Sequence, residues 1–156
     1  MLRKPLAVLA LALAIPVFAS GYANYCNSRY GFCVDYPANF GMEPAPVNND
    51  GRIFYDGEGF RMTASGINNV LDGTVKSEMK SREDDFDSVT YRKQQDNWYA
   101  LSGYKDDNIL YVKSWVGSGA INSLYLQYPT AMKDEYDETV KHLVKSFIPG
   151  DLEESH

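Results

Sequence analysis

"WYALSGYKDDNILYVKSWVGSGAINSLYLQY" (98–128) decides the fold class, because it holds three strand-like runs separated by very short connections. The runs 98–104, 109–116 and 121–128 are strand-like, and turn-rich segments separate them, as is typical of neighbouring strands. The connections "KDDN" and "GSGA" are rich in turn-forming residues, and connections this short join antiparallel neighbours. Together with the preceding run "SVTYRK" (88–93), the stretch predicts a four-stranded antiparallel meander.

Upstream of the meander, the same reasoning predicts three more strands. "FCVDY" (32–36) alternates apolar and polar residues, and "RIFY" (52–55) and "FRMTASG" (60–66) flank the turn "DGEG". The Pro-rich connector "GMEPAPVNND" (41–50) separates the first of these strands from the other two. We therefore expect a single strand and then a hairpin before the meander.

Two helices are predicted by apolar residues that recur at helical spacing. Leu71, Val75 and Met79 are four residues apart and predict an amphipathic helix over about 71–83. A second helix ends at Pro149, and its apolar stripe consists of Met132, Tyr136, Val140, Leu143 and Phe147. The sequence thus predicts an α+β domain, with an antiparallel β-sheet of about six to seven strands packed against two main helices.

The N-terminus has the layout of a secretory signal peptide. Arg3 and Lys4 precede the apolar run "PLAVLALALAIPVFA" (5–19), which is shorter than the ~20 apolar residues of a membrane-spanning helix. Cleavage after Ala19 or after Ala23 satisfies the preference for small residues at the site, and the sequence leaves both positions open.

The signal peptide is expected to occupy 1–23, a single α+β domain 24–149 and a flexible tail 150–156. Removal of the two N-terminal basic residues changes the formal net charge from -6 to -8. Nucleic acids and anionic lipids are bound by clustered Lys and Arg, and no such cluster stands out in the sequence. We therefore expect a soluble periplasmic or secreted protein that binds no nucleic acid and does not insert into a membrane after signal cleavage.

Cys26 and Cys33 are the only cysteines of the chain. In an oxidising compartment two such neighbours pair, and the segment "NSRYGF" between them contains residues that let a chain reverse. A zinc site would need further Cys or His residues nearby, and a catalytic thiol would need a base. We therefore predict a Cys26–Cys33 disulfide that closes a hairpin or tight loop.

Four stretches together resemble a group of small secreted bacterial domains with the PsbP-like α-β-α sandwich. They are "SRYGFCVDYPANF" (28–40), "NNDGRIFYDGEGFRMTASG" (48–66), "VTYRKQQDNWYALSGYKDDNILYVKSW" (89–115) and "YPTAMKDEYDETVKHLVKSF" (128–147). The resemblance covers nearly all of the chain after the signal peptide. It implies the fold, because most of the matching positions are strand apolars, turn glycines and one helix face. It also extends to immunity proteins that neutralise toxins delivered into the periplasm by type VI secretion.

Residues that could carry catalysis or hold a metal are few. His142 lies one step off the apolar stripe of the closing helix, where a half-exposed surface histidine is the preferred interpretation. The acidic run "EDDFD" (83–87) could offer oxygen ligands to calcium, but it lacks the alternating loop of a dedicated calcium site, and a solvated helix end is preferred. We expect no catalytic residue, no metal and no cofactor.

Aromatic residues alternate with polar ones in the meander and suggest a binding surface. The "KDDN" loop places Trp98 opposite Trp115 and Ser102 opposite Tyr111. A two- or four-residue loop before Trp98 adds Tyr91, so the candidate partner-binding face consists of Tyr91, Trp98, Tyr111, Lys113 and Trp115. Aromatic rings mixed with polar groups are typical of protein-binding surfaces. The alternative is that the first helix covers this face and the rings form core.

The sequence therefore favours an exported, non-enzymatic binding module that recognises another protein in the periplasm. An immunity protein against a periplasmic type VI toxin is the specific alternative, in which the acidic charge would steer a basic toxin. A carboxylate-based cell-wall hydrolase is the weaker alternative, because no motif in the sequence supports it.

Overall fold

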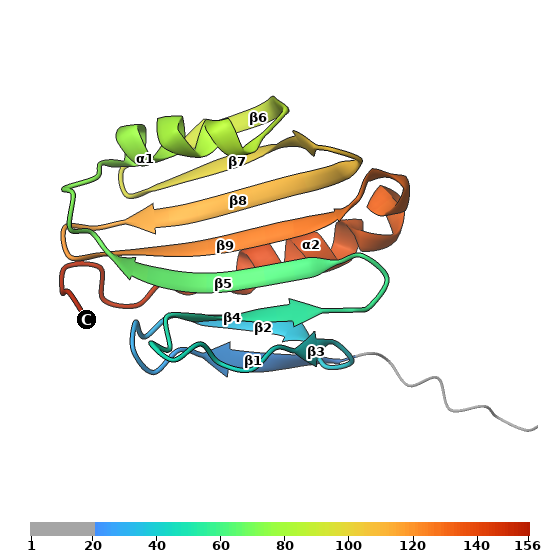
Figure 1. Cartoon of the computed structure of the whole chain (residues 1–156), viewed down its shortest axis with the longest axis horizontal. Helices are drawn as coiled ribbons and strands as arrows, with labels where there is room; N and C mark the ends of the chain where they lie inside the picture. Colours follow the sequence, from blue (N-terminus) through green and yellow to red (C-terminus); the bar gives the residue numbers. More distant parts are fainter. Residues whose placement is uncertain (1–20) are drawn as a thin grey trace, which may run out of the picture.

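The computed structural model describes residues 21–156 (Figure 1). Most of the predicted signal peptide, including the cleavage position after Ala19, lies outside the described residues. The other position, after Ala23, lies inside a strand. Within residues 21–156, no helix is long and apolar enough to span a membrane.

A seven-stranded antiparallel sheet forms the centre of the described domain. Its strands lie in the order β3-β4-β5-β9-β8-β7-β6. Their bounds are β3 Gly41–Met42, β4 Gly51–Tyr55, β5 Arg61–Asn68, β6 Ser88–Gln94, β7 Trp98–Lys105, β8 Asn108–Val116 and β9 Ala120–Pro129. The predicted α+β class and the meander β6–β9 are confirmed. The meander joins the earlier hairpin because β9 pairs along its length with β5.

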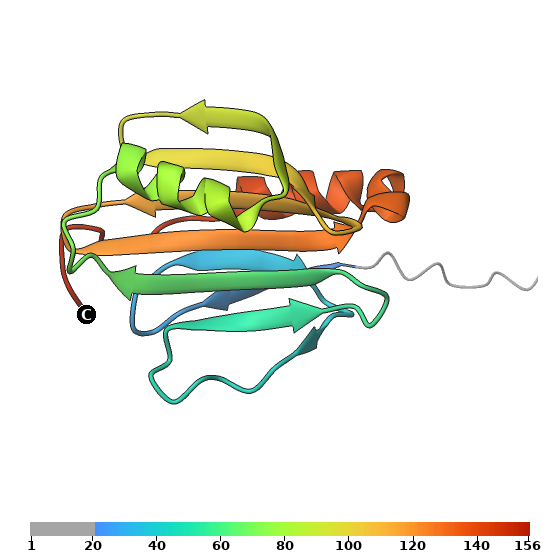
Figure 2. The ribbon, with the colours of Figure 1, turned by 45° about the horizontal axis from the view of Figure 1, so that its top comes forward.

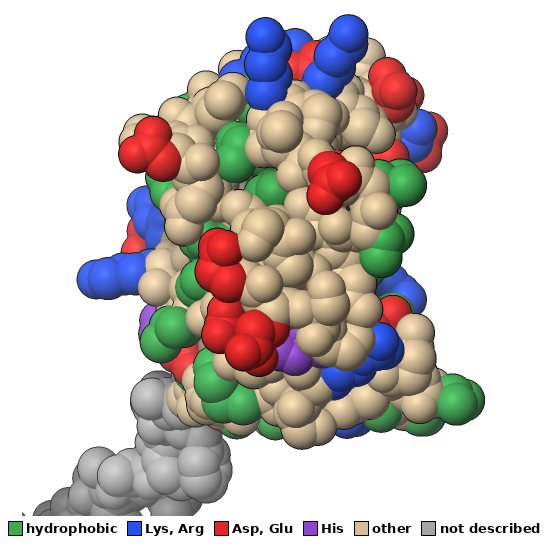
Figure 3. All heavy atoms as spheres, turned by 90° about the vertical axis from the view of Figure 1, so that its left-hand side faces the viewer, with side chains coloured by type: hydrophobic (Ala, Val, Ile, Leu, Met, Phe, Trp, Pro, Cys, Tyr) green, Lys and Arg blue, Asp and Glu red, His purple; other side chains and the backbone are tan. Residues whose placement is uncertain are grey.

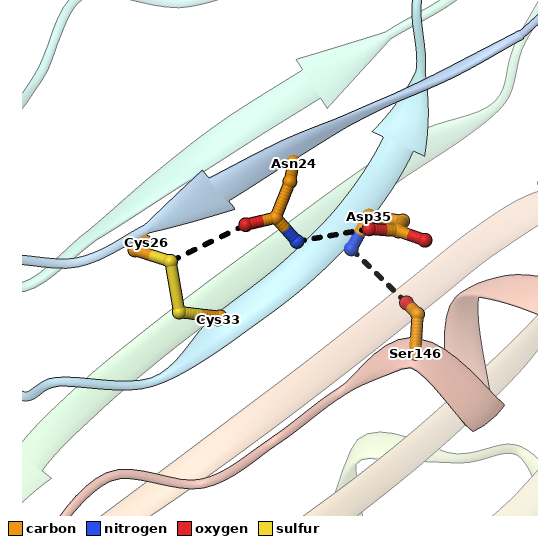
Figure 4. The surroundings of a disulfide bond; sticks show 5 residues. All are labelled: Asn24, Cys26, Cys33, Asp35 and Ser146. Atoms are coloured by element: carbon orange, nitrogen blue, oxygen red, sulfur yellow. Dashed lines mark hydrogen bonds between the residues drawn. A yellow bond between two sulfur atoms is a disulfide. The ribbon is translucent and has the colours of Figure 1, made fainter.

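A second, two-stranded sheet carries the disulfide. It pairs β1 (Tyr22–Cys26) with β2 (Cys33–Pro37), and Cys26 and Cys33 are directly opposite each other and bonded (Figure 4). The sequence predicted the second of these strands and the clasp, and both are confirmed. It did not predict β1, because that segment overlaps the expected signal peptide.

The first helix is shorter than predicted. α1 spans Val75–Arg82 and continues as the 3-10 turn η1 (Glu83–Asp85). Thr74 is its N-cap, and the Thr74 hydroxyl accepts a hydrogen bond from the Ser77 backbone N–H. Because this cap begins the helix, Leu71 stays in the preceding loop, where it is 89% exposed.

The closing helix matches its prediction. α2 spans Lys133–Ser146 and follows the 3-10 turn η2 (Thr130–Met132). Its apolar side packs against β9 and against β2 of the small sheet. Leu143 is fully buried there, and Phe147, just beyond the helix, stacks on Phe32.

The layers are helix, sheet, and then helix with hairpin. α1 lies on one face of the large sheet, and α2 lies with the β1–β2 hairpin on the other (Figures 1 and 2). Each side has its own core. The core under α1 includes Val75, Tyr99, Leu101, Leu110 and Val112. The core on the α2 side is larger and includes Phe32, Phe54, Met62, Leu124 and Leu143.

Residues 150–156, expected to form a flexible tail, instead dock along one end of the large sheet. The backbone N–H groups of Gly119 and Ala120 both donate to the Leu152 carbonyl, at 2.8 and 3.0 Å. Asn68 bonds the backbone of His156 through both its amide nitrogen and its amide oxygen. The expectation was based on the position of these residues at the chain terminus, and it did not include the backbone pairing with the turn between β8 and β9.

Candidate functional site

The predicted aromatic residues share one face of the sheet, because the pairing of β6, β7 and β8 aligns them in rows. Tyr91, Ser102 and Tyr111 form one row across the three strands. Lys93, Ala100 and Lys113 form the next. In the third row Trp98 is opposite Trp115. The cross-strand pairs inferred from the sequence are therefore confirmed.

The first helix does not cover this face. α1 packs on the opposite side of β7, over Tyr99 and Leu101. The face lies on the side of α2, which in the large sheet packs against β9. Which helix would cover the rings depends on the path of the chain over the sheet, and the apolar periodicity of a helix does not encode that path.

Five side chains on this surface remain accessible, and we call them the lysine-aromatic face: Tyr91, Lys93, Trp98, Tyr111 and Lys113. Tyr91 is 47% exposed. Lys93 is exposed, and Trp98, Tyr111 and Lys113 are half-buried. Beneath them Ala100 is only 1% exposed, because the larger side chains of the same rows lie over it.

Trp115 differs from the other predicted members of the face. It is only 7% exposed, and its ring stacks on Phe147 with centroids 4.5 Å apart and an interplanar angle of 10°. The sequence placed Trp115 on the correct side of the sheet. Phe147, which follows α2, then covers the Trp115 ring. Trp115 therefore belongs to the core next to the lysine-aromatic face and is not part of its accessible surface.

Two lysines flank the Trp98 ring. The Lys113 Nζ lies 4.1 Å from the Trp98 ring centroid and 4.8 Å from that of Trp115, and the Lys93 Nζ lies 5.6 Å from Trp98. Each contact places a cation near the electron-rich face of an indole, which is worth about 0.5–2 kcal/mol depending on solvation. The two lysines therefore hold Trp98 between them.

Burial and mutual repulsion alter titration on this surface. The pKa of Lys113 is lowered, first because its ammonium is partly desolvated and then because Lys93 adds a second positive charge. Desolvation also raises the pKa of Tyr111 to about 12, so its hydroxyl is neutral and able to donate a hydrogen bond at physiological pH. The surface thus offers cations and neutral hydroxyl groups.

A groove of about 510 Å³ separates the lysine-aromatic face from α2. Tyr111, Lys113 and Trp115 form its sheet wall, and Val140, Lys141, Val144, Lys145 and Phe147 close the other side. The α2 side of this groove was missed by the sequence reasoning. The only signal for it was that the off-stripe positions of the helix carry lysines.

His142, Asp35 and Ser146 lie close together and resemble a catalytic triad, but their contacts serve a structural role. Its Nε2 lies 2.8 Å from the Asp35 carboxylate, and its ring stacks on Tyr22 with centroids 3.6 Å apart. The nearby Ser146 hydroxyl accepts from the Asp35 N–H and donates to the Leu143 carbonyl. Because that hydroxyl is occupied by backbone groups, these residues join α2 to the β1–β2 hairpin rather than activate a nucleophile.

Three of the four acidic residues considered for calcium pair with cations instead. Glu83 pairs with Arg92 at 2.6 Å, Asp85 with Arg82 at 3.0 Å, and Asp87 with Lys105 at 3.7 Å. Over residues 21–156, no three His, Cys, Asp or Glu side chains lie close enough together to hold a metal ion. The run therefore connects the end of α1 to β6 and β7.

A second, smaller pocket of about 280 Å³ lies between the turn after β4 and the start of α2. Asp56, Glu58, Glu135 and Tyr136 line it, and Tyr136 donates its hydroxyl to the Asp56 carboxylate. Burial would raise the pKa of Asp56, but hydrogen bonds from Tyr136 and from two backbone N–H groups outweigh burial and lower it. Asp56 is thus ionised and engaged in the turn, which does not suit a general acid.

The fold is shared with proteins of known structure. The chain matches cyanobacterial PsbP (CyanoP) from Synechocystis sp. PCC 6803 with a TM-score of 0.54 and 16% identity, over 89% of this chain and 98% of that one. It matches the Saccharomyces cerevisiae Ran-binding protein Mog1p with a TM-score of 0.55 and 9% identity, over 85% and 97%. The domain therefore has the PsbP-like fold. Comparison with models of protein families and with curated protein sequences gives no match.

Proposed function

We propose that this chain is a non-enzymatic module that recognises another protein through the lysine-aromatic face. The observation that carries the proposal is the uncovered position of Tyr91, Trp98 and Tyr111 on a sheet face whose other half is packed under α2. Aromatic side chains on rigid strands supply large contact areas at little entropic cost, and they dominate binding energy at interfaces. The Ran-binding protein Mog1p shares the fold, so the fold is compatible with protein recognition.

Export to the periplasm is part of this proposal. The Cys26–Cys33 disulfide joins an exposed and a half-buried cysteine of the hairpin, and disulfides persist in oxidising compartments. The basic and apolar N-terminal segment supports the same location.

Site-specific photo-crosslinking tests the proposed face directly. A benzophenone amino acid in place of Tyr91 is expected to form a covalent adduct with the partner in intact cells. The matched control is Tyr55 on β4, which is 41% exposed. Cross-strand pairing places Tyr55 in one row with Arg61, Gln127 and Leu110. Because Leu110 belongs to the core under α1, Tyr55 lies on the opposite side of the sheet from Tyr91. Adducts from position 55 alone, or from neither position, would contradict the proposal.

Alanine substitution then measures the energetic contribution of the rings. Trp98→Ala and Tyr91→Ala are each expected to weaken binding of the cross-linked partner by about 2 kcal/mol, or roughly 30-fold. Tyr55→Ala is expected to change the affinity by less than threefold. Equal losses at all three positions would indicate a general effect on folding rather than a binding face.

Immunity against a periplasmic type VI toxin is the specific form of this function that we propose. It is supported by the resemblance to immunity proteins of this fold, and it agrees with a small, exported, disulfide-closed domain. A gene for a secreted toxin next to this one is expected. Co-expression of that toxin in the periplasm should be lethal without this chain and tolerated with it, and continued killing in its presence would refute the immunity role.

A further inference from the structure

The lysine-aromatic face concentrates positive charge on an acidic protein. The whole chain carries a formal charge of -6, yet Lys113, Lys141 and Lys145 line the groove, Lys93 lies beside it, and no Asp or Glu is among the groove's lining residues. Carboxylates gather elsewhere. Figure 3 shows many of them on the end of the molecule where the C-terminal residues dock, and Asp72, Asp96 and Glu153 line a hollow that includes the β8–β9 turn.

Three of these four lysines have no anionic partner within residues 21–156. Lys141 pairs with Glu138 at 2.8 Å, whereas Lys93, Lys113 and Lys145 form no ion pair with the described residues. Lys113 is also partly desolvated between two indoles. A cation held in this way is less stable than one in water unless an anion neutralises it. The attraction of an arriving carboxylate would offset both the desolvation of Lys113 and its repulsion from Lys93.

Apolar contacts lie next to the charges. Val140, Val144 and Phe147 line the α2 side of the groove, and Trp98 and Tyr111 lie on the sheet side. A ligand that fits must therefore alternate carboxylates with apolar or aromatic side chains over a few residues. We infer that the groove binds an acidic, partly apolar peptide segment of the partner protein, with its carboxylates on Lys93, Lys113 and Lys145.

This inference rests on the proposed function and specifies the chemistry of the partner. It also revises the expectation of a basic partner, which was based on net charge: at this face the local charge has the opposite sign. A short acidic segment contacts only the lysines. A duplex or an anionic membrane is a larger polyanion whose charges would also face the surrounding carboxylates, because electrostatic interactions extend about 8 Å at physiological salt.

A random library of twelve-residue peptides displayed on phage, selected against the purified protein, tests the charge preference without bias. We expect enriched peptides with net negative charge and at least one Trp, Phe or Leu. The double variant Lys113→Gln and Lys145→Gln should weaken their binding at least tenfold. The single variant Lys113→Arg keeps the positive charge and should retain most of the binding. The matched control is Lys76→Gln combined with Lys80→Gln, which removes the same charge from exposed lysines of α1 and should change affinity less than twofold.

Several outcomes would overturn the inference. They are the enrichment of neutral or basic peptides, the absence of any enrichment, and acidic peptides that bind equally well to the groove variant and to the control. Vesicles of phosphatidylcholine with 30% phosphatidylglycerol are the comparison for an anionic surface. If these vesicles bind through the same lysines more tightly than the peptides do, the partner class is a membrane and the inference is wrong.

The native partner separates this inference from the proposed function. If Trp98→Ala abolishes its binding while the Lys113→Gln and Lys145→Gln variant binds normally, the face is the interface but the partner segment is not acidic. If neither variant affects binding, the proposed function fails at this face as well. In circular dichroism melts the lysine variants should agree with the parent protein within about 3 °C and Trp98→Ala within about 5 °C, so that a loss of binding reports on contact rather than on folding.

Discussion

Replacing Trp115 by alanine should unfold this domain at a much lower temperature. The indole is 7% exposed and stacks on Phe147 at 4.5 Å. A buried aromatic side chain removes about 150–250 Å² from water, which at about 25 cal/mol per Å² gives an upper estimate of about 4–6 kcal/mol. Measured truncations of buried aromatic residues fall at about 3–5 kcal/mol. We therefore expect Trp115→Ala to lower the free energy of unfolding by about 4 kcal/mol.

Differential scanning calorimetry provides the measurement. The entropy of unfolding is about 2.1 cal/mol/K per residue, so a loss of about 4 kcal/mol should lower Tm by roughly 14 °C for a domain of this size. The matched control is Trp98→Ala, whose indole is half-buried on the lysine-aromatic face and should cost only about 1–1.5 kcal/mol. These are the only two tryptophans of the chain, so the remaining one in each variant also reports its environment by fluorescence.

A double-mutant cycle with Phe147→Ala isolates the stacking itself. The coupling energy should be about 0.5–1.5 kcal/mol, as for other aromatic pairs. If Trp115→Ala lowers Tm by less than about 4 °C, or if Trp98→Ala is as destabilising, the division of this sheet face into a covered and an uncovered part is wrong. The reasoning for the lysine-aromatic face would then fail with it.

Three further predictions concern other parts of the molecule. Mass spectrometry of the native protein should find Cys26 and Cys33 oxidised, and their reduction should lower stability by about 2.5 kcal/mol without abolishing folding, because the large sheet and both helices lie outside the ring. Tyr136→Phe should destabilise the domain by about 1–2 kcal/mol at neutral pH, since it removes a hydrogen bond to an ionised carboxylate. Because the pKa of Asp56 is lowered by folding, its contribution is fully present above the unfolded value of about 3.9 and is lost as the pH falls through the lower folded value. The Tyr136→Phe difference should therefore shrink in urea titrations at acid pH, and an unchanged difference would count against an ionised Asp56. Intact-mass analysis of the exported protein should show cleavage after Ala19, because cleavage four residues later would remove the first two residues of β1.

The sequence alone determined the elements whose signals are local. Strand-like runs bounded by turn-forming residues identified β2 and β4 to β9, and the "KDDN" connection fixed the pairing of Trp98 with Trp115. The apolar stripe of α2 and the Cys26–Cys33 clasp were equally readable. Each of these features depends on residues that are neighbours in the chain or separated by one short turn, so the pattern contains the information.

Only the tertiary structure decided which surfaces are covered. The sequence did not give the pairing of β5 with β9, the placement of α1 and α2 on opposite faces, or the docking of the tail against the β8–β9 turn. These contacts join residues far apart in the chain, and the helix stripes are compatible with either face of the sheet. Because α2 lies on the aromatic side, Trp115 becomes core while Trp98 stays accessible, although the two residues face each other across one strand pair and follow the same local pattern.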